Sequence, residues 1–296
     1  MRALLVGMML AVAAALAVNA HAQVVTTQQE AESFYASLYR QSDAAIDVAG
    51  GRMHIDVSSE FDFLESADAA RLFIAMGNSP EVANALEGAL MPAGVNPLYA
   101  GGWAASIEFD AVGRVEEDDS SLSFPEVLYG LRDRQSRWGV DVAGWVEPPY
   151  YERANHTLYS AFELASPQGN AVNYQMHMLG RDGVLIVNIV APMEDADLVR
   201  IAAPRLRDLF YYHDGSRYED YLDGELLAAN TLAGLLSGEL APPPAGRARS
   251  PSPPLRSRYS PSWPWLSCPY SSSSIAASPA SSRSCSYRLS SPPTWR

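Results

Sequence analysis

The feature that most constrains the fold is a pair of apolar segments, residues 172–179 and 184–191, joined by Gly180-Arg181-Asp182-Gly183. Glycine at both ends of a short polar break is typical of a tight turn between antiparallel strands. The second segment is apolar at nearly every position, so both of its faces must be covered. The chain is therefore expected to fold around a β-hairpin whose second strand is central and buried in a sheet.

Shorter alternating segments predict further strands at residues 45–48 and 53–57, at 103–109 with a partner starting at Arg114-Val115, and at 144–151 and 157–164. Helical patterns fall at 27–41, 66–76, 80–92, 124–138 and 194–211. Because hairpins predominate and βαβ units are scarce, we predict an α+β fold, a mainly antiparallel sheet with helices packed on its faces. In the last helix, the residues expected to face inward are Leu198, Ile201, Leu206, Leu209 and Phe210.

The first 22 residues have the pattern of a signal peptide. Arg2 precedes an apolar run at residues 4–18, and Ala20-His21-Ala22 gives the small-x-small cleavage pattern. An uncleaved anchor is the alternative, but the run is shorter than the roughly 20 residues that a membrane-spanning helix needs. We therefore expect an exported protein whose mature chain starts at Gln23.

Several stretches of the body resemble one bacterial family. They are Gly77-Asn78-Ser79-Pro80, residues 144–150 (GWVEPPY), residues 179–185 (LGRDGVL) and residues 215–221 (GSRYEDY), and they occur in the family's order over residues 40–240. The family comprises predicted membrane-anchored proteins and is known only as a domain of unknown function. The resemblance implies a signal peptide, an extracytoplasmic domain and a C-terminal membrane helix, and it implies no activity. It places the protein in the periplasm or on the periplasmic face of the inner membrane.

The C-terminal end departs from this pattern. We expect an α+β domain at 23–223 and a helix at 224–241 that leads towards the membrane anchor of the relatives. Residues 242–296 instead contain 12 prolines, 17 serines and seven arginines, with no apolar run of membrane length. A GC-rich gene for an Ala/Leu/Val helix, read one base out of frame, would give this composition. We hypothesise a frameshift near residue 242. The alternative is a natural disordered Ser/Pro/Arg-rich tail.

The sequence contains no catalytic motif that we recognise: no Gly-x-Ser-x-Gly, phosphate-binding loop, His-Glu-x-x-His or dinucleotide fingerprint. His54, His156, His177 and His213 are isolated from one another, and a metal site would need partners that only folding could reveal. We therefore predict no catalytic residue, no metal ligand and no cofactor. Residues 1–241 carry 14 arginines against 34 acidic residues, which argues against nucleic acid as a partner.

The best candidate surface comes from the two hairpins between residues 144 and 191. Alternation places Trp145, Glu147, Tyr159 and Glu163 on one side of the first hairpin, and Leu158, Phe162 and Leu164 on the other side. It also places Asn173, Gln175 and His177 together on one side of the second hairpin. Pro148-Pro149 indicates that its strand lies at a sheet edge or at a break in pairing. The residues of the candidate interaction surface are Trp145, Glu147, Tyr159, Glu163 and His177.

Two functional hypotheses follow. The first is a non-catalytic binding domain in the envelope, whose partner is another envelope protein. The second is a hydrolase-like enzyme that uses the carboxylates of Glu147 and Glu163 for acid–base chemistry. A site in which both glutamates converge with His156 or His177 would favour the enzyme. A filled sheet face with an exposed apolar patch would favour the binding domain.

Overall fold

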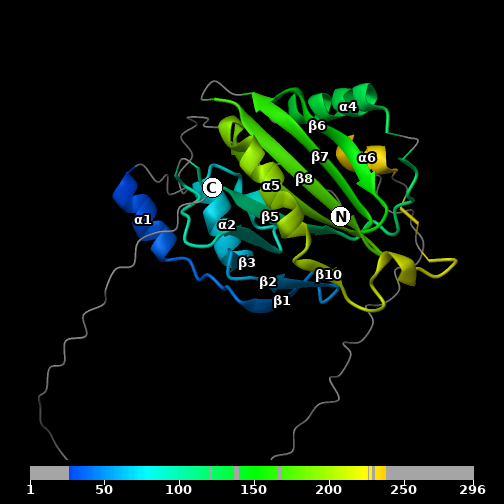
Figure 1. The fold of residues 1–296 in the computed structure, drawn as a ribbon, viewed down its shortest axis with the longest axis horizontal. Helices are drawn as coiled ribbons and strands as arrows, with labels where there is room; N and C mark the ends of the chain where they lie inside the picture. The colour runs from blue at the N-terminus through cyan, green and yellow to red at the C-terminus, as the bar shows by residue number, and fades with distance from the viewer. Residues whose placement is uncertain are drawn as a thin grey trace, which may run out of the picture. The chain divides into compact units, whose positions relative to one another are not determined.

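The computed structural model describes residues 27–99, 101–119, 122–136, 140–165, 169–225, 227–228 and 231–237. Its largest element is a seven-stranded sheet in the order β3-β4-β5-β9-β8-β7-β6 (Figure 1). All neighbouring strands are antiparallel, which confirms the predicted α+β fold. The strands are β3 (Phe61–Glu65), β4 (Gly88–Pro92), β5 (Ala104–Asp110), β6 (Asp141–Glu152), β7 (Thr157–Ala165), β8 (Ala171–Leu179) and β9 (Val184–Pro192).

The hairpin of β8 and β9 lies in the interior of this sheet, as predicted. Its register runs from Ala171 opposite Pro192 to Leu179 opposite Val184, and every residue of β9 except Pro192 is buried. Gly183 lies against the end of β5, where a Cβ atom would come within 2.3 Å of the Asp110 carbonyl oxygen. The glycine therefore allows the hairpin turn to pack directly on the neighbouring strand.

A second sheet has three strands in the order β1 (Ala44–Val48), β2 (Met53–Val57) and β10 (Phe210–Tyr212). The β1–β2 hairpin was predicted, and its turn contains Gly50 and Gly51 with φ values of +66° and +81°. Strand β10 was not predicted, because the helical pattern was extended through residue 211. It exists because it pairs with β2, in the register Phe210 opposite Ile55.

The helix before β10 is shorter and turned differently than we expected. α5 spans Ala196–Arg207 and follows the 3₁₀ turn η2 (Met193–Asp195). The expectation that Leu198 and Ile201 face inward is wrong, because they are 57% and 56% exposed. Leu206 is buried as predicted, and so are Leu209 and Phe210 beyond the end of the helix. Within α5, the buried residues are Val199, Ala203 and Leu206.

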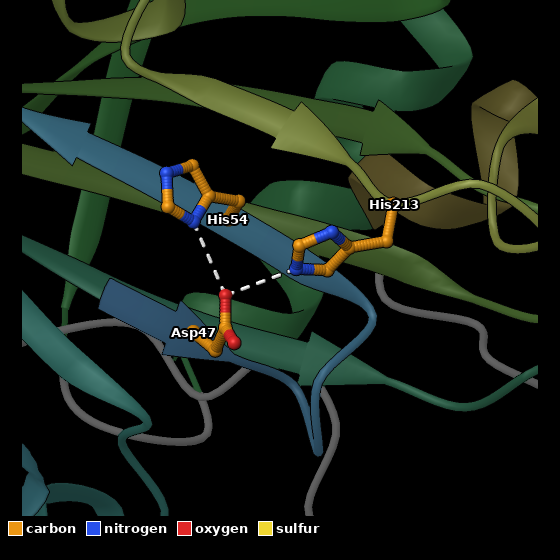
Figure 2. Close-up of side chains that lie close together, drawn as sticks. All are labelled: Asp47, His54 and His213. Atoms are coloured by element: carbon orange, nitrogen blue, oxygen red, sulfur yellow. Dashed lines mark hydrogen bonds and ion pairs between the residues drawn. The ribbon is translucent and has the colours of Figure 1, made fainter. Parts of the chain in front are cut away.

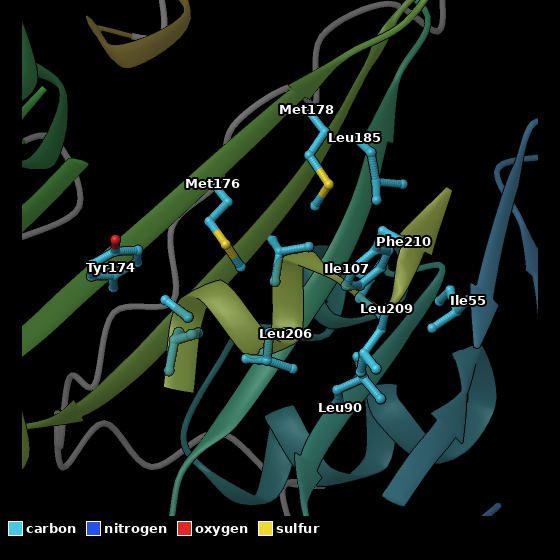
Figure 3. Packing of buried hydrophobic residues seen from close by; sticks show 14 of the residues in the cluster. Ile55, Leu90, Ile107, Tyr174, Met176, Met178, Leu185, Leu206, Leu209 and Phe210 are labelled. Atoms are coloured by element: carbon cyan, nitrogen blue, oxygen red, sulfur yellow. The ribbon is translucent and has the colours of Figure 1, made fainter. Parts of the chain in front are cut away.

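The main core fills the space between α5, the small sheet and one face of the large sheet, which we call the α5 face. Figure 3 shows Leu206 and Phe210 gathered with Ile55 against Met176 and Leu185 of the large sheet. All five side chains are buried. Apolar burial of this extent is the dominant favourable term in folding, so this core holds the two sheets together.

The opposite face of the large sheet, which we call the α4 face, has three apolar clusters. The first packs α2 (Ser66–Ala75) on β3 and β4 through Leu72 and Phe73. The second packs α4 (Phe124–Ser136) and α6 (Leu232–Ser237) on β7, β8 and β9, and it includes Leu158 and Ile186. The third packs α4 on β6 and β7, and it includes Phe162. The sheet between these clusters carries polar side chains.

Other predictions are corrected at the ends of elements. α1 (Gln28–Ala36) has a capping box of Thr27 and Glu30, as its N-terminal pattern suggested, but it ends before residue 41. α3 (Pro80–Ala83) is a single turn, and residues expected to continue it form β4. Arg114 forms an isolated bridge to Leu227 and does not begin a strand.

Predictions for the two chain ends fall mainly outside the described residues. The signal peptide (1–22) and the tail (242–296) lie there entirely. Of the helix expected at 224–241, the structure describes α6. Within the described residues, no helix has both the length and the apolar composition needed to cross a membrane.

Candidate functional site

The candidate surface predicted from sequence is divided between the two faces of the large sheet. In the register of β6 and β7, Trp145 lies opposite Phe162, whereas Glu147 lies opposite Ala161. Residues opposite one another in an antiparallel pair share a face, so Trp145 and Glu147 point to different sides. The prediction that they share a side is wrong, because bulges in β6 shift the alternation between residues 145 and 150.

Glu147, Tyr159 and Glu163 lie on the α5 face, at the end of the sheet formed by β6 and β7. Glu163 accepts a hydrogen bond from the Asn170 side chain, and one buried oxygen of Glu147 has no hydrogen-bond partner. Tyr159 stacks on Tyr150, with 4.9 Å between ring centroids, and burial raises the pKa of Tyr159 to about 12.

Trp145 and His177 lie on the α4 face. Trp145 packs edge-on against Phe162, at 6.3 Å between centroids, and its indole N–H donates to the Phe124 carbonyl oxygen at 3.4 Å. His177 is fully buried in the middle of the sheet, on the other side from Glu147 and Glu163. The structure therefore does not bring this histidine and the two glutamates together.

His156 was the other histidine considered as a partner of these glutamates. It occupies the turn between β6 and β7 with φ of +51°, and it lies between two different acids. Its Nδ1 contacts Glu117, its Nε2 lies 2.7 Å from Glu219, and its ring stacks on Tyr218 at 4.5 Å. These contacts join three distant segments, which gives His156 a structural role at this end of the domain.

The α4 face carries a continuous row of buried polar residues between its apolar clusters. Ser106 of β5 lies opposite Asn188 of β9. Asn188 in turn lies opposite Gln175 of β8, and Gln175 lies opposite Ser160 of β7. None of the four is more than 5% exposed. A polar row across four adjacent strands is unusual in a sheet interior, because burying polar groups is costly unless each finds a partner.

Charged and titratable residues extend this row. Glu108 and Asp110 share the α4 face with Ser106 on β5, and His177 lies two residues from Gln175 on β8. Arg134 of α4 is close enough to both carboxyl groups and to His177 to influence their pKa values. We call the whole set the polar layer: Ser106, Glu108, Asp110, Arg134, Ser160, Asn173, Gln175, His177 and Asn188.

Many buried atoms of the polar layer have no hydrogen-bond partner within the described protein. Both polar atoms of the Asn173 side chain are unpaired although the residue is 0% exposed. The other unpaired atoms are Asp110 Oδ2, Arg134 Nε and Nη1, Ser160 Oγ, His177 Nδ1 and Asn188 Oδ1. Each unsatisfied buried group costs about 1–3 kcal/mol of stability. The layer therefore needs partners from water or from a ligand.

Burial also changes the protonation of the layer. It raises the pKa of Glu108 to about 8 and that of Asp110 to about 7, while Arg134 acts in the opposite direction on both. Burial and, to a smaller extent, the positive charge of Arg134 together lower the pKa of His177 to about 3. At pH 7, His177 is thus neutral, Glu108 is mostly protonated and Asp110 is half-ionised. The layer presents mixed hydrogen-bond donors and acceptors with little net charge.

Sequence reasoning found part of this site. It placed Asn173, Gln175 and His177 on one side of β8, which the structure confirms. Asn188, a polar residue inside the apolar segment 184–191, is a further signal that the sequence contains. It missed Glu108 and Asp110, although their alternation with Ile107 in a predicted strand was a usable signal. Arg134 could not be assigned, because its position depends on how α4 packs.

Fold and site together define an α+β domain with a buried polar layer on one face of its antiparallel sheet. The chain belongs to the family described as Protein of unknown function (DUF2167), whose profile matches residues 40–243. This confirms the expected membership in a family of unknown function. The comparison with curated proteins gives no match.

Comparison with solved structures gives weak likenesses. The cyanobacterial PsbP protein (CyanoP) of Synechocystis sp. PCC 6803 is 10% identical, with 60% of this chain and 94% of that chain covered and a TM-score of 0.36. The Ran-binding protein Mog1p of Saccharomyces cerevisiae is 11% identical, with 60% and 96% covered and a TM-score of 0.32. The protein of unknown function PA94 of Pseudomonas aeruginosa is 10% identical, with 57% and 91% covered and a TM-score of 0.22. These values are too low to transfer a function.

Proposed function

We propose that the chain is an exported, non-catalytic binding domain of the cell envelope, and that its ligand is a small polar molecule held by the polar layer. The observation that carries this proposal is the set of unpartnered buried atoms, above all both polar atoms of Asn173. A ligand with several donors and acceptors and little net charge, such as a polyhydroxylated or amide-bearing molecule, complements such a set.

We place the entry of a ligand into the layer at its charged end. Asn173 and Ser160 are fully buried, whereas Glu108 and Arg134 are only partly buried, so the layer reaches solvent at these two residues. Export is supported by the leader pattern at residues 1–22, and a place in the periplasm or on the inner membrane's periplasmic face is part of the same proposal.

The hydrolase hypothesis loses its basis in the geometry. It required Glu147 and Glu163 to converge with His156 or His177, but His177 lies on the other face of the sheet and His156 is held by Glu117 and Glu219. Perturbed pKa values like those of Glu108 and Asp110 do occur at catalytic sites. Here burial is the main cause of both raised pKa values, and it acts on buried structural carboxyl groups as well as on catalytic ones.

The binding proposal is tested by asking what the protein carries. Protein purified natively from the periplasmic fraction is denatured, and the released small molecules are identified by mass spectrometry. We expect about one polar molecule per chain from the wild type and none from the double variant Asn173→Leu/Asn188→Leu. Circular dichroism checks that this variant is folded. Arg200→Gln, an exposed change on α5, is the control and retains the molecule. Release of no molecule from the wild type contradicts the proposal.

A second candidate function, binding of another envelope protein, is favoured by the exposed side chains of the edge strand β6. Val146 is 38% exposed and Tyr150 is 43% exposed. Pro148-Pro149 and the bulges prevent β6 from adding another strand, so a partner would contact its side chains. Capture from envelope extract by the wild type but not by Tyr150→Ser supports this candidate, and equal capture by both contradicts it.

A further inference from the structure

Three side chains of types that bind metals meet on the outer face of the small sheet, away from the polar layer. They are Asp47 on β1, His54 on β2 and His213 just after β10 (Figure 2). Sequence patterns do not reveal this cluster, because His213 is far from the other two residues along the chain. The strands bring them together.

The backbone fixes all three positions. Asp47 lies directly opposite His54 in the β1–β2 hairpin, and His54 lies opposite Tyr211 in the β2–β10 pair. The His213 backbone N–H donates to the Arg52 carbonyl oxygen at 2.9 Å, which continues the pairing of β2 with β10 by a further step. Each of three adjacent strands therefore presents one ligand on the same face.

The distances suit a metal ion. Asp47 Oδ1 lies 3.1 Å from His54 Nδ1 and 2.9 Å from His213 Nε2, and the three ligand atoms all lie within 4.8 Å of one another. Zinc–ligand bonds are about 2.0–2.2 Å long, so tetrahedral ligands lie roughly 3.3–3.5 Å apart. The Asp47 oxygen is thus a few tenths of an ångström closer to each nitrogen than in a tetrahedral site. The side chains of His54 and His213 are 30% and 43% exposed, so both can adjust around an ion.

The local charge also favours a cation. The neighbouring positive group, the guanidinium of Arg52, is already bound to Asp182 at 3.0 Å and to the Ala49 carbonyl oxygen at 2.9 Å. The Asp47 carboxylate contributes the acidic ligand of the cluster.

We propose that Asp47, His54 and His213 bind one divalent transition-metal ion of the zinc type. Two imidazole nitrogens and one carboxylate oxygen match zinc, cobalt, nickel and copper, whereas calcium and magnesium take oxygen ligands. Three protein ligands leave at least one coordination position for water or for an external group. The ion would also link β10 to the β1–β2 hairpin, although these elements are far apart in the sequence. The site does not depend on the polar layer or on its ligand.

The test is a titration of the folded protein, purified without a histidine tag and treated with chelator, using zinc chloride alone. We expect one zinc ion per chain by calorimetry and elemental analysis. Asp47→Asn, His54→Ala and His213→Ala should each weaken binding by about 100-fold, since each removes a direct ligand. Asp56→Asn is the matched control for Asp47→Asn. It also removes one carboxylate, from the face of β2 that carries His54, and it should leave binding unchanged.

A second measurement locates the ion independently of any variant. Nitrogen NMR of the imidazole rings should show zinc-dependent shifts at His54 Nδ1 and His213 Nε2, with His156 and His177 unmoved. Absence of binding at one equivalent overturns the proposal, as does binding that survives the three substitutions or shifts confined to other histidines. Circular dichroism in chelator confirms that each variant is folded. Failure here would leave the polar layer and its proposed ligand untouched.

Discussion

Asn188 of β9 lies directly opposite Gln175 of β8 in the centre of the large sheet, and its side-chain oxygen has no hydrogen-bond partner. Most sheets place an apolar side chain at such a position. A buried polar atom without a partner lowers stability, so its presence here indicates a role other than stability.

In the absence of ligand, replacing buried amides of the polar layer with leucine should stabilise the protein. Asn173→Leu removes two unpaired atoms and Asn188→Leu removes one, so each should raise the free energy of unfolding by about 1–3 kcal/mol. Urea unfolding measures the change. Asn84→Ala, an exposed substitution at the end of α3, is the control and should shift stability by less than about 0.5 kcal/mol. Destabilisation by both leucines would show that these amides are already satisfied.

Stability should fall as pH rises from about 6.5 to 8.5. The folded-state pKa values of Glu108 and Asp110, about 8 and about 7, lie above their ordinary values. The folded protein therefore holds protons that the unfolded chain has lost, and the free energy of unfolding decreases through this window by about 2 kcal/mol. His177, with a pKa of about 3, stays neutral there and adds nothing.

The double variant Glu108→Gln/Asp110→Asn should flatten this pH dependence, as measured by urea unfolding at several pH values. Its matched control is Glu81→Gln/Asp56→Asn, which removes two exposed carboxylates and should keep the wild-type slope. A wild-type stability that is constant or rises between pH 6.5 and 8.5 would contradict the assigned protonation of the layer.

The orientation of α5 can be checked with two leucines of that helix. Leu206 is fully buried between the two sheets, so Leu206→Ala should cost about 2–5 kcal/mol. Leu198 is 57% exposed, and Leu198→Ala should cost less than about 0.5 kcal/mol. Thermal or urea unfolding distinguishes these values, and similar losses for both variants would mean that the helix is turned differently.

A glycine pair tests the packing of the central hairpin on β5. An added Cβ at Gly183 would clash with the Asp110 carbonyl oxygen, whereas one at Gly144 of β6 meets nothing within 4 Å. Gly183→Ala should therefore destabilise the protein by about 1–3 kcal/mol. Gly144→Ala should be tolerated, and equal effects of the two changes on the unfolding midpoint would argue against this contact.

Local patterns predicted the parts of the fold that local chemistry determines. The β8–β9 hairpin followed from alternation and two glycines, and α2 followed from its apolar spacing and Gly77. Phe210 could not be placed in a strand from the sequence, because it belongs to a strand only through its pairing with Ile55 of β2. Glu147 could not be assigned to its face, because the bulges of β6 shift the alternation within a short stretch.

The candidate site was predictable only in part, for the same reason. Asn173 and His177 share a face by alternation alone, but the role of that face depends on Arg134 and Glu108, which reach it through tertiary packing. The cluster of Asp47, His54 and His213 likewise depends on β10 joining the small sheet.

The most direct test of the central claim is a high-resolution crystal structure of protein purified natively from the periplasm. We expect density for a bound polar molecule in contact with Asn173, Asn188 and Arg134. A layer in which ordered water alone satisfies every one of these atoms would contradict a ligand-binding role.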